Sequence, residues 1–122
     1  MGKIFLKKGD YIYIGSAKGC LEARLRRHLR KNKKTYWHID YLLKDERTQI
    51  SQIWVILKSI ECEIAEVFYR NLFTETAKKG FGSSDCKCET HLFYIKNKEK
   101  MKKVLNEKGF SKRMEFESYD NN

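Results

Sequence analysis

The stretch of sequence that decides the fold is residues 11–30, YIYIGSAKGCLEARLRRHLR. It begins with aromatic and β-branched residues, which predict a strand that ends at Gly15. Leucines then recur every four residues, at positions 21, 25 and 29, and this spacing predicts a helix over about residues 20–31. Arg24 and His28 lie one helical turn apart and share a face of that helix. The stretch therefore predicts a strand, a glycine loop and a helix that presents a cation beside an imidazole.

The rest of the chain predicts a small layered domain. We expect strands at residues 4–6, 11–14, 53–57 and 91–95, a short helix that is capped by Thr35 and carries Trp37, Tyr41 and Leu42, and helices at 61–77 and 97–109. Leu72 falls on the apolar stripe of the first of these two longer helices. In the second, we expect Asn97 as the cap, Met101, Val104 and Leu105 pointing inward, and Gly109 at the end. This order indicates an α/β (α+β) fold with a mainly antiparallel or mixed sheet flanked by helices. We expect one domain over residues 1–110 and a C-terminal tail over residues 111–122.

Composition and charge narrow the class of protein. The chain has 122 residues, is 41% hydrophobic and 13% aromatic, and has no apolar run long enough for a membrane span or a signal peptide. We therefore expect a soluble, cytoplasmic protein without a membrane partner. The net charge is +10, and residues 1–44 hold 12 basic and 3 acidic residues. Such a concentration of positive charge predicts a nucleic-acid partner.

The positive charge is densest in residues 24–34, where seven of eleven residues are Lys or Arg. A solvated helix face would explain such a run, but the uneven distribution along the chain favours a track for phosphates. The residues that we expect to bind nucleic acid are Lys18, Arg26, Arg27, Arg30, Lys31, Lys33 and Lys34.

Four residue types in this order suit phosphodiester hydrolysis: Tyr13, Arg24, His28 and Glu61. A carboxylate can hold a divalent cation on the phosphate, and a guanidinium can bind its oxygens as charge develops. A phenol or an imidazole can accept a proton from water. Each residue taken alone has a structural explanation, as a strand tyrosine, a solvated arginine, a half-buried histidine or an acid at a helix start.

The order of motifs resembles the GIY-YIG endonuclease superfamily. The matching blocks are Tyr11-Ile-Tyr-Ile-Gly-Ser-Ala17, His38-Ile-Asp-Tyr-Leu-Leu43, Glu61-Cys-Glu63 and Gly80-Phe-Gly-Ser-Ser-Asp-Cys-Lys-Cys88 with His91-Leu-Phe-Tyr94. Together they look like a largely archaeal, uncharacterised branch that is sometimes fused to a repair glycosylase. The resemblance covers about residues 9–95. It implies the GIY-YIG fold and a nuclease activity.

The resemblance also implies roles for single residues. Tyr13 stands at the position of the proposed general base, Arg24 at that of the catalytic arginine, and His28 where the superfamily has Tyr or His. Glu61 matches the glutamate that binds the metal, with Glu63 as its alternative. The chain departs from the superfamily pattern at its start, where the Gly-Ile-Tyr motif and its strand are missing, and at the late Pro-x-x-Asn motif.

The cysteines suggest a second kind of site. Cys86, Cys88 and His91 could be three zinc ligands, with the fourth supplied by Cys20, Cys62 or Asp85. The competing interpretation, which we favour from the sequence, is a tight loop that packs its thiols inward.

We therefore expect an endonuclease that uses Mg²⁺ or Mn²⁺ to cleave DNA, or RNA in second place, with a role in repair. In the mechanism that we expect, nearby cations lower the pKa of Tyr13. One alternative is a catalytically inactive nucleic-acid-binding module of the same fold. A more distant one is a zinc-stapled protein-interaction domain.

Overall fold

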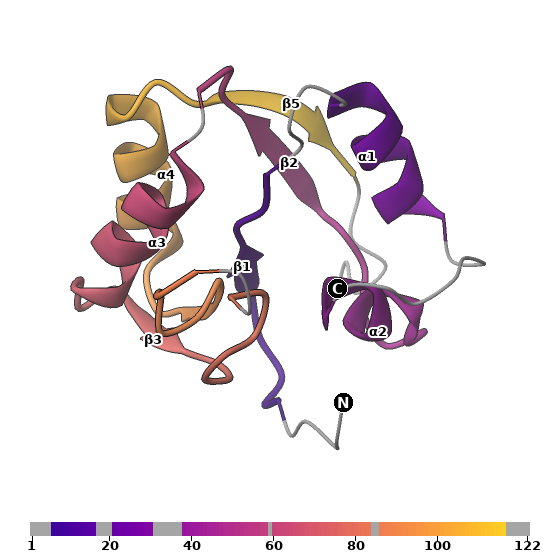
Figure 1. Cartoon of the computed structure of the whole chain (residues 1–122), viewed down its shortest axis with the longest axis horizontal. Coiled ribbons are helices and arrows are strands. Elements are labelled where there is room, and N and C mark those ends of the chain that lie inside the picture. The colour runs from indigo at the N-terminus through magenta and orange to yellow at the C-terminus, as the bar shows by residue number, and fades with distance from the viewer. Residues whose placement is uncertain (1–5, 17–20, 31–37, 59, 84–85, 117–122) are drawn as a thin grey trace.

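A computed structural model describes residues 6–16, 21–30, 38–58, 60–83 and 86–116 (Figure 1). In chain order its elements are β1 (Tyr11–Tyr13), α1 (Leu21–Leu29), α2 (His38–Lys44), β2 (Gln52–Val55), α3 (Glu61–Tyr69), β3 (Thr74–Thr76), β4 (Leu92–Ile95), α4 (Lys98–Glu107) and β5 (Ser111–Glu115). The expected α+β fold with antiparallel strands and flanking helices is confirmed.

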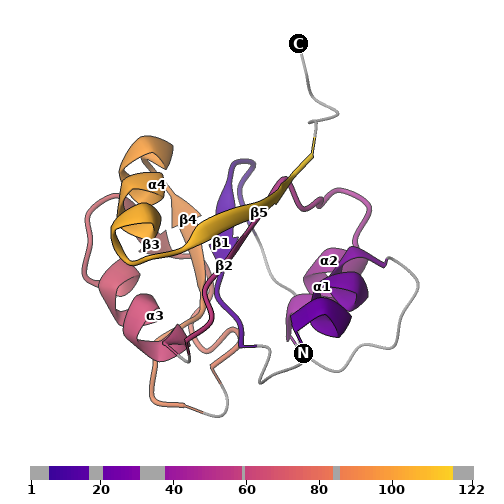
Figure 2. The ribbon, with the colours of Figure 1, turned by 90° about the horizontal axis from the view of Figure 1, so that it is seen from above.

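A three-stranded antiparallel sheet lies at the centre, in the order β1-β4-β3. Tyr13 pairs with Leu92 and Thr74 pairs with Ile95. Seen from above, α3 and α4 lie together on one side of this sheet, and α1 and α2 lie on the other (Figure 2), with α1 above α2 in Figure 1. Because neighbouring side chains of a strand point to opposite faces, β4 serves two separate cores.

The larger core lies between the sheet and helices α3 and α4. Phe68 and Phe93 are fully buried there, with their ring centroids 5.9 Å apart. The expected inward residues of α4, Met101 and Leu105, are also buried. Asn97 begins that helix as expected, because its side-chain oxygen accepts a hydrogen bond of 3.1 Å from the backbone N–H of Lys100.

The smaller core lies on the opposite face of the sheet. It contains Ile39 and Leu43 of α2, Phe81 and Leu92, and both Tyr11 and Tyr13 pack against it. The two tyrosines therefore share one face of the sheet, as residues two apart in a strand do. In α2 the buried residues are Ile39, Asp40 and Leu43, while Tyr41 is 45% exposed.

Two polar contacts fasten α1 to the rest of the domain. The Arg24 guanidinium donates a hydrogen bond of 2.9 Å to the carbonyl oxygen of Ser16, in the loop after β1. The Arg27 guanidinium lies 2.6 Å from the carboxylate of Asp40, which is completely buried in α2. The first contact holds α1 at the end of β1, and the second holds it against α2.

Strands β2 and β5 form a separate antiparallel ribbon that arches over the sheet (Figure 1). Our expectation of a tail from residue 111 was wrong for residues 111–115, since Ser111 pairs with Val55 and Met114 with Ile53. The strand expected at 53–57 is present as β2, but it is half-buried and not fully buried, because it belongs to a two-stranded ribbon. Residues Ser111–Glu115 are mostly polar and exposed, so the hydrophobic pattern of the sequence does not predict β5.

The helix expected over residues 61–77 is wrong in its second half. Helix α3 ends at Tyr69, and the side chains of Asn71 and Thr74 then bond to carbonyl oxygens of its last turn. Leu72, which we expected on the apolar face of the helix, is 94% exposed. Threonines at 74 and 76 favour the extended β3 that follows.

Some expectations fall on residues that the structure does not describe. The strand at 4–6 lies mostly among them, as do Thr35 and Trp37. Within the described ranges, every helix is too short or too polar to cross a bilayer.

Candidate active site and metal centre

Tyr13 occupies a cradle made by two glycines. A Cβ atom at Gly15 would lie 3.0 Å from the Tyr13 ring, and one at Gly82 would lie 2.9 Å from its other edge. Gly82 also has a φ of +70°, which glycine adopts without strain. Phe81 meets the same ring edge-on, with centroids 6.1 Å apart. Phe81 and Gly82 therefore build one wall of the tyrosine site.

The environment of Tyr13 makes its phenol a weaker acid. Burial, followed by the negative charge of Asp40, raises the pKa of Tyr13 to about 12, against a smaller lowering by Arg24. Our expectation that nearby cations lower this pKa was wrong, because burial of the phenol and the charge of Asp40 outweigh the effect of Arg24. No pattern in the sequence indicates that Asp40 is buried. At neutral pH the hydroxyl is a neutral hydrogen-bonding group.

Arg24 and His28 project from α1 toward the same cleft as Tyr13. This broad cleft has a volume of about 2030 Å³, and Tyr13, Arg24, His28 and Glu61 all line it. The effect of Arg24 on the pKa of Tyr13 shows that the guanidinium lies near the phenol. All four residues that the sequence singled out as catalytic border this cleft, which is long enough to include residues of β2, β4 and α4 as well.

Glu61 reaches this cleft from the opposite side of the sheet. Helix α3 packs on the face away from the Tyr13 ring, but Glu61 lies in its first turn. Its charge acts on His91, whose ring bonds to the backbone of Ile14 next to Tyr13. Glu63, the alternative metal ligand, is exposed and lies outside the cleft lining.

The residues expected to bind phosphates have different surroundings. Arg26 and Arg30 are exposed on α1, as a phosphate track requires. Arg27 is held against buried Asp40 instead, so we correct its role to a structural one. The lysines at positions 18, 31, 33 and 34 lie outside the described residues.

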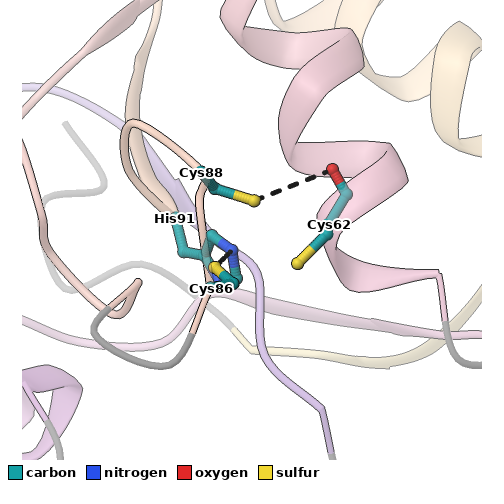
Figure 3. Close-up of side chains that lie close together, drawn as sticks. All are labelled: Cys62, Cys86, Cys88 and His91. Atoms are coloured by element: carbon teal, nitrogen blue, oxygen red, sulfur yellow. Dashed lines mark hydrogen bonds between the residues drawn. The ribbon is translucent and has the colours of Figure 1, made fainter.

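Three thiols and an imidazole gather beside the candidate active site (Figure 3). Cys62 comes from the first turn of α3, Cys86 and Cys88 from the loop before β4, and His91 from the residue that precedes β4. Their ligand atoms all lie within 4.8 Å of one another, so the four residues could hold a metal ion. Of the three residues that we considered as a fourth ligand, Cys62 is the one that lies beside Cys86, Cys88 and His91 in the described part of the chain. Cys20 and Asp85, the other two, lie outside the described residues.

The electrostatics of the cluster depend on its burial. Burial lowers the pKa of His91, so the imidazole is neutral and able to act as a ligand near neutral pH. Burial, followed by hydrogen bonding to the neighbouring thiols of Cys62 and Cys86, raises the pKa of Cys88 to about 12. A bound cation would reverse this preference, because a coordinating thiol loses its proton.

Comparison with known proteins places the chain in a family. A family model described as a domain of unknown function, DUF123, matches residues 1–114. No curated protein and no solved structure matches the chain significantly. The family match spans every helix and strand described above up to the last residue of β5, and the chain therefore belongs to the DUF123 family.

Proposed function

We propose that this protein is a metal-dependent endonuclease of the GIY-YIG type that hydrolyses phosphodiester bonds, in DNA rather than RNA. The observation that carries the proposal is the shared cleft of Tyr13, Arg24, His28 and Glu61. These residues come from a strand, a helix and a second helix on the other side of the sheet. Each has an ordinary structural explanation alone, but none of those explanations requires all four to border one cleft.

Tyr13 acts in this proposal as a neutral phenol. With a pKa raised to about 12 by burial, it cannot be ionised in advance at neutral pH. Its hydroxyl instead orients the attacking water, since a phenol both donates and accepts hydrogen bonds. An imidazole nitrogen can accept a proton, so His28, which also lines the cleft, is our candidate for the group that accepts the proton of the water.

Arg24 and Glu61 act on the phosphate. The bond from Arg24 to the Ser16 carbonyl fixes the guanidinium at the cleft, where it can stabilise charge that develops on phosphate oxygens. Mg²⁺ in nucleotide-processing sites is held by one or two carboxylates and by the substrate phosphates, and the single carboxylate of Glu61 fits that pattern. Such an ion would neutralise charge on a non-bridging oxygen.

A binding module without catalysis is the second candidate. The observation that favours it is the raised pKa of Tyr13, which weakens that residue as a base. The exposed Arg26 and Arg30 would serve binding in either case. The two candidates differ in whether any substrate is cleaved when a divalent metal is supplied.

The test is cleavage of labelled single-stranded, flapped and branched DNA and RNA with Mg²⁺ or Mn²⁺, against the same reactions with EDTA. We expect Tyr13→Phe to lower the cleavage rate by about 10²-fold, because the attacking water would no longer be held in place. Tyr11→Phe is its control, because the Tyr11 hydroxyl donates to the Lys7 carbonyl instead. Equal loss in both variants would contradict the role of Tyr13, and a wild type that binds but never cleaves would establish the binding module.

A further inference from the structure

We propose that Cys62, Cys86, Cys88 and His91 bind one zinc ion in a closed, structural site. Three sulfur ligands and one imidazole nitrogen form a donor set that suits Zn²⁺ and excludes Mg²⁺, which requires oxygen ligands. The same four-ligand set with three cysteines and one histidine is common in structural zinc sites. This site is separate from the carboxylate of Glu61 and would hold a different metal.

The distances agree with tetrahedral coordination. Zinc bonds of about 2.3 Å to sulfur and about 2.1 Å to nitrogen imply a sulfur–nitrogen spacing of about 3.5 Å and a sulfur–sulfur spacing of about 3.8 Å. The Cys86 Sγ atom lies 3.5 Å from His91 Nε2. All four ligand atoms lie within 4.8 Å of one another, so a contraction of about 1 Å at most closes the site.

The histidine is already oriented for a metal. Its Nδ1 atom lies 3.1 Å from the Ile14 carbonyl oxygen, which can only accept a hydrogen bond, so Nδ1 carries the proton. The lone pair of Nε2 then points at the cysteine sulfurs. A hydrogen bond from the second ring nitrogen to a carbonyl is the arrangement that fixes a zinc-ligating histidine.

Cys62 contributes its sulfur from the first turn of α3. Although the hydrogen bond with Cys88 lowers its pKa, burial and the neighbouring Cys86 and Glu61 raise it overall. A bound cation would reverse this effect, because a coordinating thiol loses its proton. Figure 3 shows its sulfur on the same side of the helix end as the two loop cysteines. Within the described residues, all three cysteines are free thiols.

A zinc ion here would connect two segments that are distant in the sequence. It would fasten the start of α3 to the loop over residues 77–91, whose described residues form no helix or strand and include few buried apolar side chains. That loop carries Gly82 against the Tyr13 ring, and Glu61 precedes Cys62. If the proposed function holds, the ion therefore also fixes Glu61 relative to Tyr13.

The direct test is elemental analysis of the untagged protein purified under reducing conditions. We expect one zinc per chain, and intense visible absorption after exchange with Co²⁺, as a tetrahedral sulfur-rich site gives. Cys62→Ser should lose the bound zinc, whereas Cys20→Ser, the matched control at the remaining cysteine, should retain it. Zinc retained in Cys62→Ser, or lost in Cys20→Ser, would overturn the ligand set.

A second measurement covers variants that fail to fold. In the wild type, zinc should protect Cys62, Cys86 and Cys88 from alkylation, and a chelator should expose all three. Amide exchange should then accelerate in residues 60–64 and 86–91 more than in the β2–β5 ribbon. A wild type that takes up no zinc under reducing conditions would refute the proposal. Metal content is read without any nuclease assay, so either proposal can fail alone.

Discussion

Replacing Gly82 with alanine tests whether the glycine cradle positions Tyr13. The new methyl group would have its carbon 2.9 Å from the Tyr13 ring and 3.2 Å from the Cβ atom of His91. Gly80 provides the matched control, because it lies in the same loop with a φ of +79°, but a Cβ atom there would meet no described atom within 4 Å. Both variants carry the cost of a left-handed backbone, and only one also displaces the tyrosine.

The two costs can be separated. An alanine in the left-handed region costs about 1–2 kcal/mol, which is the loss that we expect for Gly80→Ala. Forcing a methyl group into a packed site adds about 1–3 kcal/mol, so Gly82→Ala should be less stable than Gly80→Ala by that amount. Urea unfolding of the two variants measures the difference. The cleavage rate of Gly82→Ala should also fall, because its added carbon pushes the phenol out of place.

Equal stability of the two variants would refute this reasoning. It would mean that Tyr13 yields to the methyl group without cost and that Gly82 serves only its backbone conformation. Equal nuclease activity in the two variants, with both folded, would show that the exact place of the phenol does not matter to the reaction.

Three further predictions concern charges. Arg27→Ala should destabilise the domain by about 3–5 kcal/mol in urea unfolding, because it takes the ion partner from fully buried Asp40, whereas exposed Arg26→Ala should stay within about 0.5 kcal/mol of wild type. The pKa of Tyr13 is raised to about 12 in the folded state, against about 10 in the unfolded state. The neutral phenol therefore stabilises the folded state fully below about pH 10, and this contribution is lost as the pH rises through about 12. The unfolding free energy of wild type relative to Tyr13→Phe should therefore fall by about 1 kcal/mol between about pH 9 and about pH 11, and an unchanged difference would contradict the raised pKa. Replacing Arg26 and Arg30 with Ala should weaken nucleic-acid binding and reduce the slope of log affinity against log salt by about two, because about two fewer counterions are released. An unchanged slope would show that neither arginine contacts the phosphates.

Local patterns in the sequence predicted much of the fold. Asn97 as a cap, Met101 and Leu105 as inward residues and Gly109 after the helix place α4 correctly, because capping and periodicity act within a few residues. The same reasoning failed at residues 70–77, where apolar residues continue at helical spacing. There the pairing of β3 with β4, a contact distant in sequence, decides the structure. For β5 the deciding partner is likewise distant, and its exposed polar residues carry no pattern.

The candidate site shows the same division. The sequence could name Tyr13, Arg24, His28 and Glu61 from motif order, and the structure brings them to one cleft. It could not show that Asp40 is buried beside Tyr13, because a carboxylate in a short helix is ordinarily exposed. The choice of Cys62 as partner of the loop cysteines also required the fold, since 26 residues separate it from Cys88.

The proposal that Glu61 holds a catalytic metal ion is tested most sharply by measuring cleavage and binding of a single labelled substrate by Glu61→Gln. Glutamine keeps the size of the side chain and removes the charge that would hold the divalent ion. We expect Mg²⁺-dependent cleavage to be lost while the affinity for the substrate is unchanged or slightly higher, because a negative charge that faces the phosphate has been removed. Glu63→Gln, at the neighbouring acid outside the cleft lining, should cleave as wild type does. Cleavage by Glu61→Gln at the wild-type rate would contradict the proposal that Glu61 holds the metal ion that cleavage requires.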